Sequence, residues 1–141
     1  MTTSFLHDQS MLPPSVSWSN DDISMLTLTA QGAGTVTSPD IINFAGFGAN
    51  IVVDITAITG TTPTCTVTIQ GKDVASGKYY TILTSAALAA VATTLLTIFP
   101  NAPNTANVSA NALLPRTFRV SVTVGGTSPS VTATFGASVV N

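Results

Sequence analysis

Threonine alternates with apolar residues through residues 64–70, and this alternation constrains the fold more than any other feature of the chain. In an extended strand the apolar side chains share one face and the threonines share the other. The apolar positions are Cys65, Val67 and Ile69. Gly71 and Gly77 follow and indicate a turn, because glycine adopts positive φ angles at little cost. Residues 79–83 then resume the extended pattern, so the sequence predicts a β-hairpin over residues 64–83.

The same alternation recurs along the chain and predicts an all-β fold. Extended segments are expected at residues 23–30, 41–44, 50–58, 64–70, 79–83, 93–99, 116–124 and 131–140, with a shorter one at 35–37. Alanines at 84–92 favour helix, but the flanking strands argue for a loop or an edge connection there. Without helical crossovers, parallel pairing is not expected. The prediction is an antiparallel β-sandwich of jelly-roll type with about eight strands.

The first 22 residues differ from the rest of the chain. Pro13 and Pro14 hold the backbone extended and remove two hydrogen-bond donors. The segment also contains large apolar residues, namely Phe5, Leu6, Met11, Leu12 and Trp18. A frayed terminus is one explanation, but it would not require these side chains. We therefore expect an extended arm at 1–22 that binds a neighbouring subunit, followed by one β-sandwich domain at 23–141.

Charge is scarce in this chain. Only 7% of the residues are charged, where about 25% is typical, and glutamate is absent. Four basic residues do not form the patch that phosphate contacts require, so no nucleic-acid partner is expected. Residues 86–98 are too few to cross a bilayer, and the amino-terminal residues lack the features of a signal peptide. The neutral surface indicates either a threonine-rich soluble protein or a surface that partners cover.

No pattern predicts catalysis or a cofactor. The single histidine, His7, lies in the expected arm, which lacks the rigid support that a nucleophile and its base need. Asp21 and Asp22 are adjacent, so they point apart in an extended chain. One cysteine and one histidine far apart in sequence do not make a transition-metal site. Asp73 or the Asp21 pair could offer oxygen ligands to calcium, but no spaced calcium motif is present. Cys65 is expected to be a buried apolar residue.

Two loops are expected to contact partners or to move. Residues 100–115 form a connection of about 16 residues, longer than ordinary loops, and such loops tend to be functional or mobile. The shorter loop at 71–78 holds Lys72 and Lys78, half of the basic residues in the chain, together with Asp73. We predict that Lys72 or Lys78 meets an acidic group. The candidate partner contacts are Phe5, Leu6, Met11, Leu12, Trp18, Lys72, Asp73 and Lys78.

Two segments resemble a known family. Residues 69–83 read Ile-Gln-Gly-Lys-Asp-Val-Ala-Ser-Gly-Lys-Tyr-Tyr-Thr-Ile-Leu, and residues 113–120 read Leu-Leu-Pro-Arg-Thr-Phe-Arg-Val. Both are similar to small β-sandwich proteins encoded in the structural gene clusters of tailed bacteriophages, with an alanine- and threonine-rich strand between them. The resemblance covers roughly residues 50–141. It implies a structural virion protein, most directly a capsid decoration (cement) protein that binds and stabilises the major capsid shell.

The resemblance also implies partners and a place in the virion. The partners would be the major capsid protein and further copies of the same chain, for example in a trimer at three-fold positions. The protein would lie on the capsid surface after assembly in the bacterial cytoplasm, and no catalytic residue is implied. A minor capsid protein and a neck or tail component remain alternatives. A carbohydrate- or host-surface-binding module is another, and it would stack sugars on exposed aromatic residues such as Tyr79, Tyr80 or Trp18.

Overall fold

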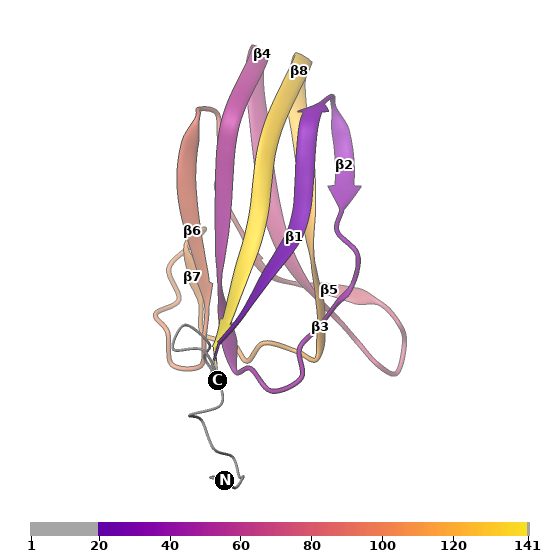
Figure 1. The fold of residues 1–141 in the computed structure, drawn as a ribbon, viewed down its shortest axis with the longest axis vertical. Helices are drawn as coiled ribbons and strands as arrows, with labels where there is room; N and C mark the ends of the chain where they lie inside the picture. The colour runs from indigo at the N-terminus through magenta and orange to yellow at the C-terminus, as the bar shows by residue number, and fades with distance from the viewer. Residues whose placement is uncertain (1–19, 141) are drawn as a thin grey trace, which may run out of the picture.

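A computed structural model describes residues 20–140, and these residues form an all-β sandwich of jelly-roll type (Figure 1). The strands are β1 (Asn20–Gln31), β2 (Gly34–Thr37), β3 (Ile41–Ile42), β4 (Gly48–Lys72), β5 (Tyr79–Thr84), β6 (Ala92–Ile98), β7 (Ser109–Ala110) and β8 (Thr117–Val140). The predicted fold class is confirmed. The predicted arm contacts Phe5, Leu6, Met11, Leu12 and Trp18 lie outside the described residues. β1 begins at Asn20, inside the segment expected to be the arm.

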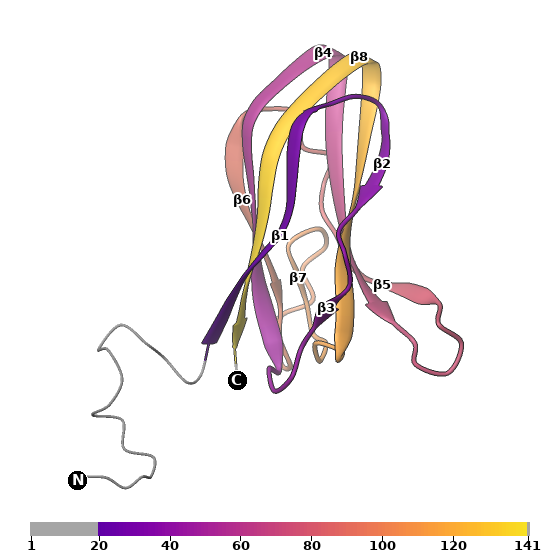
Figure 2. The ribbon, with the colours of Figure 1, turned by 45° about the vertical axis from the view of Figure 1, so that its right-hand side comes forward.

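Two long strands, β4 and β8, organise the sandwich. They pair antiparallel from Gly48 opposite Val140 to Gly71 opposite Phe118, and both bend sharply near their midpoints. Figure 2 shows that each strand rises, folds over and descends, so that one hydrogen-bonded sheet closes into two layers. The turns predicted at residues 60–63 and 125–129 are therefore bends within continuous strands.

Glycine makes these bends possible. Gly60 and Gly126 have φ angles of 123° and 113°, a region that residues with a Cβ rarely adopt. The two bends also cross closely. A Cβ at Gly126 would lie 2.8 Å from the carbonyl oxygen of Thr62, and a Cβ at Gly60 would lie 2.9 Å from the Cα of Pro129. The layers can fold onto each other only where both strands carry glycine.

The shorter strands extend both layers. β1 pairs with the second half of β8, and β6 with the first half of β4, so the first layer runs β1, β8, β4, β6 and β7. β2 and β3 pair with the first half of β8, and β5 with the second half of β4, to make the second layer. The pairing of β4 with β5 confirms the predicted hairpin.

One prediction about pairing is wrong. β7 runs parallel to β6, with Thr97 opposite Ser109 and Ile98 opposite Ala110. The irregular loop after β6 brings the chain back to the β6 edge in the same direction, so this two-residue contact needs no helical crossover. The segment at 84–92 contains no helix, and Leu88 makes a bridge to Cys65.

Apolar side chains on the inner faces of the two layers fill the core. The predicted apolar set of Cys65, Val67 and Ile69 is buried, and the largest fully buried side chains include Phe118, Phe135, Ile51, Ile55 and Ile69. Cys65 is fully buried among them, as predicted. Burial raises the pKa of its thiol, so this cysteine stays protonated and behaves as an apolar residue.

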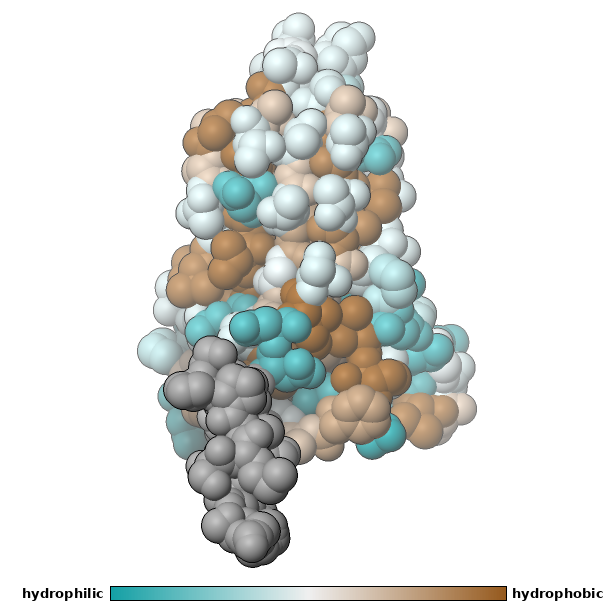
Figure 3. Space-filling model, viewed as in Figure 1, coloured by the Kyte–Doolittle hydropathy of each residue, from teal (hydrophilic) through white to brown (hydrophobic). Residues whose placement is uncertain are grey.

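The two ends of the sandwich differ in construction. We call the end formed by residues 31–34, 59–64 and 125–129 the turn end. We call the opposite end, formed by residues 39–48, 71–79 and 99–117, the loop end; β1 starts there and β8 finishes there. Figure 3 shows pale, neutral side chains at the top of the molecule, and both strongly hydrophilic and apolar ones towards the bottom.

Candidate functional site

The loop end carries almost all the charge of the described residues. Its charged side chains, including those on the strands that begin or finish there, are Asp21, Asp22, Asp40, Lys72, Asp73, Lys78, Arg116 and Arg119. Asp54 lies midway along the first half of β4, between the two ends of the sandwich, opposite Thr134. The three turns at the other end consist of glycine, threonine, serine, proline, alanine and glutamine. The charged residues and the long loops thus lie at the same end of the molecule.

Several large apolar side chains are exposed at the same end, and three of them form a group on two loops. Phe44, Phe47 and Leu113 are 79%, 54% and 62% exposed, and we call them the end patch. They come from neighbouring loops, because the carbonyl oxygen of Phe47 accepts a hydrogen bond from the amide of Leu114 at 2.9 Å. The guanidinium of Arg116 lies 5.6 Å from the centre of the Phe44 ring. Apolar residues gathered in this way at a surface are typical of interaction sites.

Asn43 holds the loops beneath the end patch. Its side chain is buried, its Nδ2 donates to the carbonyl oxygens of Gly46 at 2.8 Å and Leu114 at 3.3 Å, and its Oδ1 accepts from the amide of Gly46 at 2.8 Å. Its own amide donates to the carbonyl oxygen of Arg116 at 2.7 Å. One buried amide therefore ties residues 43–46 to residues 114–116 and gives the patch a fixed support.

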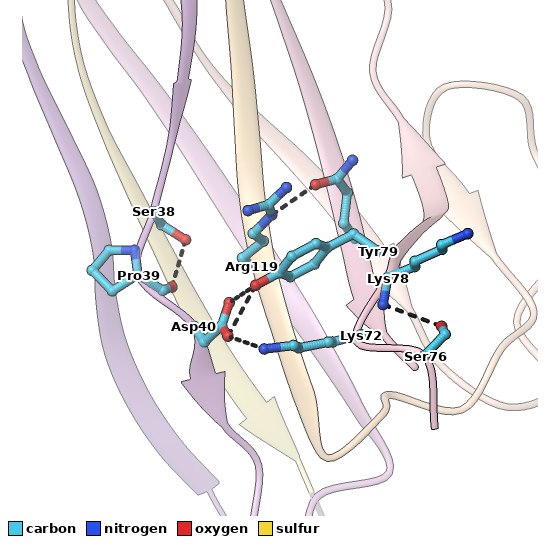
Figure 4. Close-up of polar contacts among 9 residues, drawn as sticks. Ser38, Pro39, Asp40, Lys72, Ser76, Lys78, Tyr79 and Arg119 are labelled. Atoms are coloured by element: carbon cyan, nitrogen blue, oxygen red, sulfur yellow. Dashed lines mark hydrogen bonds and ion pairs between the residues drawn. The ribbon is translucent and has the colours of Figure 1, made fainter. Parts of the chain in front are cut away.

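Beside the patch, on the outer face of the second layer, five side chains form one polar network. We call Asp40, Gln70, Lys72, Tyr79 and Arg119 the Tyr79 cluster (Figure 4). The Tyr79 hydroxyl donates to the Asp40 carboxylate, 2.8 Å from Oδ1 and 3.0 Å from Oδ2. Lys72 Nζ lies 3.3 Å from Asp40 Oδ2. The Arg119 guanidinium stacks 3.4 Å from the centre of the Tyr79 ring, and its Nε donates to Gln70 Oε1 at 2.8 Å.

These contacts fix the ionisation of the cluster. The hydroxyl of Tyr79, and then the ammonium of Lys72, hold the pKa of Asp40 below its usual range. The same carboxylate raises the pKa of Lys72. At neutral pH Asp40 is therefore ionised and Lys72 protonated, and neither is poised to exchange a proton. The cluster acts as a brace that joins the residue before β3 to β4, β5 and β8.

The three predicted contact residues of the 71–78 loop do not act together. Lys72 meets an acidic group within its own chain, Asp40. Asp73 accepts hydrogen bonds from the amide and the hydroxyl of Ser76, which lower its pKa. The Lys78 ammonium makes no ion pair with residues 20–140, and Figure 4 shows it pointing away from the cluster. Of the three, Lys78 is the side chain left available to a partner.

Neither tyrosine of the hairpin is an open stacking platform. Arg119 covers one face of Tyr79. Tyr80 is 48% exposed and packs over Gly71, where a Cβ would lie 2.5 Å from its Cζ and 2.8 Å from the Pro115 side chain. Lys72 Nζ also lies 5.4 Å from the centre of the Tyr79 ring, so sugar stacking of the kind expected for a carbohydrate-binding module would be limited mainly to the uncovered part of Tyr80.

Sequence reasoning missed most of this end. Asp40, Gln70 and Arg119 join the cluster through the register of β4 with β8 and the path of the chain before β3, which no local pattern reveals. Phe44 was expected in a strand, but β3 ends at Ile42. The glycines at 46 and 48 after an asparagine were the one available sign of a tight loop there.

Residues 20–140 contain no group of three histidine, cysteine or acidic side chains placed to hold a metal ion. They contain no helix long and apolar enough to cross a bilayer.

Comparison with known proteins identifies no family. No family model matches the chain, and no curated protein matches it significantly. A chain of a solved structure described as "Structure of infectious bursal disease virus Gx strain" is 14% identical, with 92% of this chain and 36% of that chain covered, at a TM-score of 0.33. This chain thus spans about a third of that chain's length. A similarity at this TM-score does not support an inference about the fold or the function of this chain.

Proposed function

We propose that this protein is a structural component of a tailed-bacteriophage virion, a capsid decoration protein that binds and stabilises the shell of the major capsid protein. It would lie on the capsid surface and act without catalysis, by adding buried area between neighbouring capsid subunits. The amino-terminal residues Phe5, Leu6, Met11, Leu12 and Trp18 and the loop residues Lys72, Asp73 and Lys78 are proposed as partner contacts.

The observation that carries the proposal is the position of the two segments that resemble phage proteins. Residues 69–83 and 113–120 adjoin in space, with Ile69 opposite Val120 and Gly71 opposite Phe118. The second segment contributes Leu113 to the end patch, and Tyr80 of the first segment packs with Pro115 of the second around Gly71. Leu113 of the end patch thus lies in a phage-like segment, as do the exposed Val74 and Tyr80, whereas Phe44 and Phe47 come from the loop before β4. A partner surface that covers the patch would remove this apolar area from water.

The remaining contacts fit the same binding surface. Lys78 and Arg116 supply positive charge beside apolar side chains, a combination suited to an acidic rim around an apolar contact on a partner. The amino-terminal segment joins the sheet at this end, where Asn20 pairs with Val140. Arm and patch would therefore reach the same neighbour.

Gold labelling of virions with an antibody against this chain tests the proposal. The sample is the phage whose genome encodes the protein, viewed by negative-stain microscopy. We expect label distributed over the capsid shell. Label confined to the neck or tail would replace the decoration role with the alternative structural role, and unlabelled virions would contradict a virion role altogether.

A deletion tests the part played by the arm. Removal of residues 1–19 spares β1, so the sandwich should keep its circular dichroism spectrum and its melting temperature. We expect the shortened protein to be lost from capsids on sedimentation while the full chain stays bound. Equal retention of both proteins would show that the arm is not a contact.

A further inference from the structure

We propose that β6 pairs with β6 of a second copy, antiparallel and centred on Thr93, to form a two-fold symmetric dimer. The inference does not depend on the proposed virion role, because it concerns the purified chain alone. It rests on the state of one sheet edge, the register that this edge allows, and the side chains exposed along it.

The first step is that the outer edge of β6 is only half covered. One side of β6 pairs with β4 from Ala49 opposite Ile98 to Ile55 opposite Ala92. On the other side, the amide of Thr97 donates to Val108 at 3.0 Å and the amide of Phe99 to Ala110 at 3.2 Å. Backbone groups alternate between the two sides of a strand. Those of Thr93 and Leu95 therefore point to the same side as Thr97, where no strand within residues 20–140 pairs with them.

The second step is that nothing along this edge prevents pairing. Residues 91–96 contain no charge, proline or glycine, and Val91 and Leu95 are 60% and 52% exposed. Natural edge strands usually carry charge, proline or bulges that block association. β1, at the other edge of the same layer, has such protection: Asp21, Asp22 and two register shifts. The β6 edge lacks every one of these devices.

The third step is the register. Val108 and Ala110 already occupy the edge at Thr97 and Phe99, so a second strand has room only along residues 91–96. A two-fold axis at Thr93 fits that span. It places Thr93 opposite its own copy and Val91 opposite Leu95 of the second copy. The chain bends at Ala90 and Val91, so the paired segment ends at Val91 and each chain leaves the junction before it would meet the β7 segment of the other copy.

This register also explains the exposed side chains. Leu95 lies opposite Val52 on β4, which is 39% exposed, so the two form an apolar pair on the outer face of the first layer. Addition of Val91 from a second copy would extend this pair into a row across the junction. The Thr93 hydroxyl donates to Asp54 Oδ1 at 3.1 Å, so the Asp54 carboxylate is held by its own chain.

Symmetry limits the size of the assembly. A contact between identical surfaces closes at two copies, so this edge makes dimers and not trimers. A ladder of about five residues buries less than the roughly 800 Å² per partner of a standard interface. The dimer should therefore dissociate on dilution.

Sedimentation velocity on the full chain tests the inference. We expect the mass to rise from 14.3 kDa towards twice that value as the concentration increases through the micromolar range. Thr93→Lys and Leu95→Lys should each weaken association by at least about tenfold, because each places a charge at the junction. Thr27→Lys is the matched control, since Thr27 is also exposed on the outer face of the first layer but lies on β1. It should dimerise like the unmodified chain.

Several results would overturn the inference. They are a monomer at every concentration, a trimer, or a dimer that Thr93→Lys and Leu95→Lys leave intact. Amide hydrogen exchange gives an independent readout: protection at Thr93 and Leu95 should increase with protein concentration. Strong protection of both amides in the dilute monomer would mean that another part of the same chain covers the edge, and it would also contradict the dimer.

Discussion

The two ends of the sandwich are built by the same strands and yet present opposite surfaces. At the turn end, β4 and β8 bend tightly and β1 turns into β2 through Gly32 and Ala33, with only small or neutral polar residues. At the loop end, the connections between strands are long and carry the end patch, the Tyr79 cluster and most of the charge. The fold needs glycine at the two bends of the turn end, because Gly60 and Gly126 hold φ angles that other residues rarely adopt. It does not need an exposed Phe44 or Leu113, so these residues point to function.

The inner side of the loop end should be firmly packed, despite its exposed apolar surface. Phe118 is fully buried there, at the β8 position opposite Gly71. Phe118→Ala is expected to lower the free energy of unfolding by about 3–5 kcal/mol, through lost burial and the cavity that remains. Urea denaturation measures this loss. A loss below about 1 kcal/mol would mean that the loop end is loosely packed and that its apolar surface is a by-product of poor packing.

The turn end should respond to backbone changes. Gly126→Ala should cost about 1–3 kcal/mol, because alanine would be held at a strained positive φ close to the carbonyl of Thr62. Gly32→Ala is the control at the same end: a Cβ there would meet nothing within 4 Å, so stability should stay within about 1 kcal/mol of the unmodified protein. Thermal melts of both variants decide the point. Equal effects would show that the bends do not depend on glycine geometry.

The Tyr79 cluster should give a small, pH-dependent effect. Because the pKa of Asp40 is lowered on folding, its contribution is present above the carboxyl's unfolded pKa and is lost as pH falls through the folded value. Tyr79→Phe removes the main cause of that shift. We expect it to be slightly less stable than the unmodified protein at neutral pH, and the difference to vanish in acid. The effect is small because the ion pair is exposed to solvent.

Tyr80→Phe serves as the control for this pH effect. The Tyr80 hydroxyl makes no hydrogen bond to a side chain or backbone group among the described residues, so its loss should not change the pH dependence of unfolding. If Tyr79→Phe and Tyr80→Phe give the same profile, the cluster is not a brace, and Asp40 and Lys72 become candidates for contact with a partner.

The sequence predicted the strands well because their signal is local. Alternation placed Cys65, Val67 and Ile69 in the core, and glycine with proline located both bends. The sequence did not predict that β4 and β8 continue through those bends. Glycine and proline are found both in a turn between two strands and in a sharp bend within one strand, so they do not distinguish the two. Sequence reasoning also missed the parallel contact of β7, which depends on where a long loop returns.

The loop end was only partly predictable for a related reason. Lys72 and Tyr79 are conspicuous in the sequence, as a scarce charge and an aromatic residue of one hairpin, whereas Asp40 and Arg119 reach them from segments distant in sequence. Asp40 and Tyr79 are 39 positions apart, so their contact can be predicted only when the register of the whole sheet is known. The exposure of Phe44 and Phe47 likewise follows from the short length of β3 and from Asn43, not from local hydropathy.

Binding of two lysine variants to capsids tests most directly the claim that the loop end is the binding surface. Leu113→Lys places a charge in the end patch, and Thr127→Lys places one at the turn end; both positions are exposed, so both proteins should fold. In co-sedimentation with capsids stripped of the natural protein, Leu113→Lys should bind at least about tenfold more weakly than Thr127→Lys, which should match the unmodified chain. Unimpaired binding of Leu113→Lys, or loss of binding by Thr127→Lys, would contradict the account.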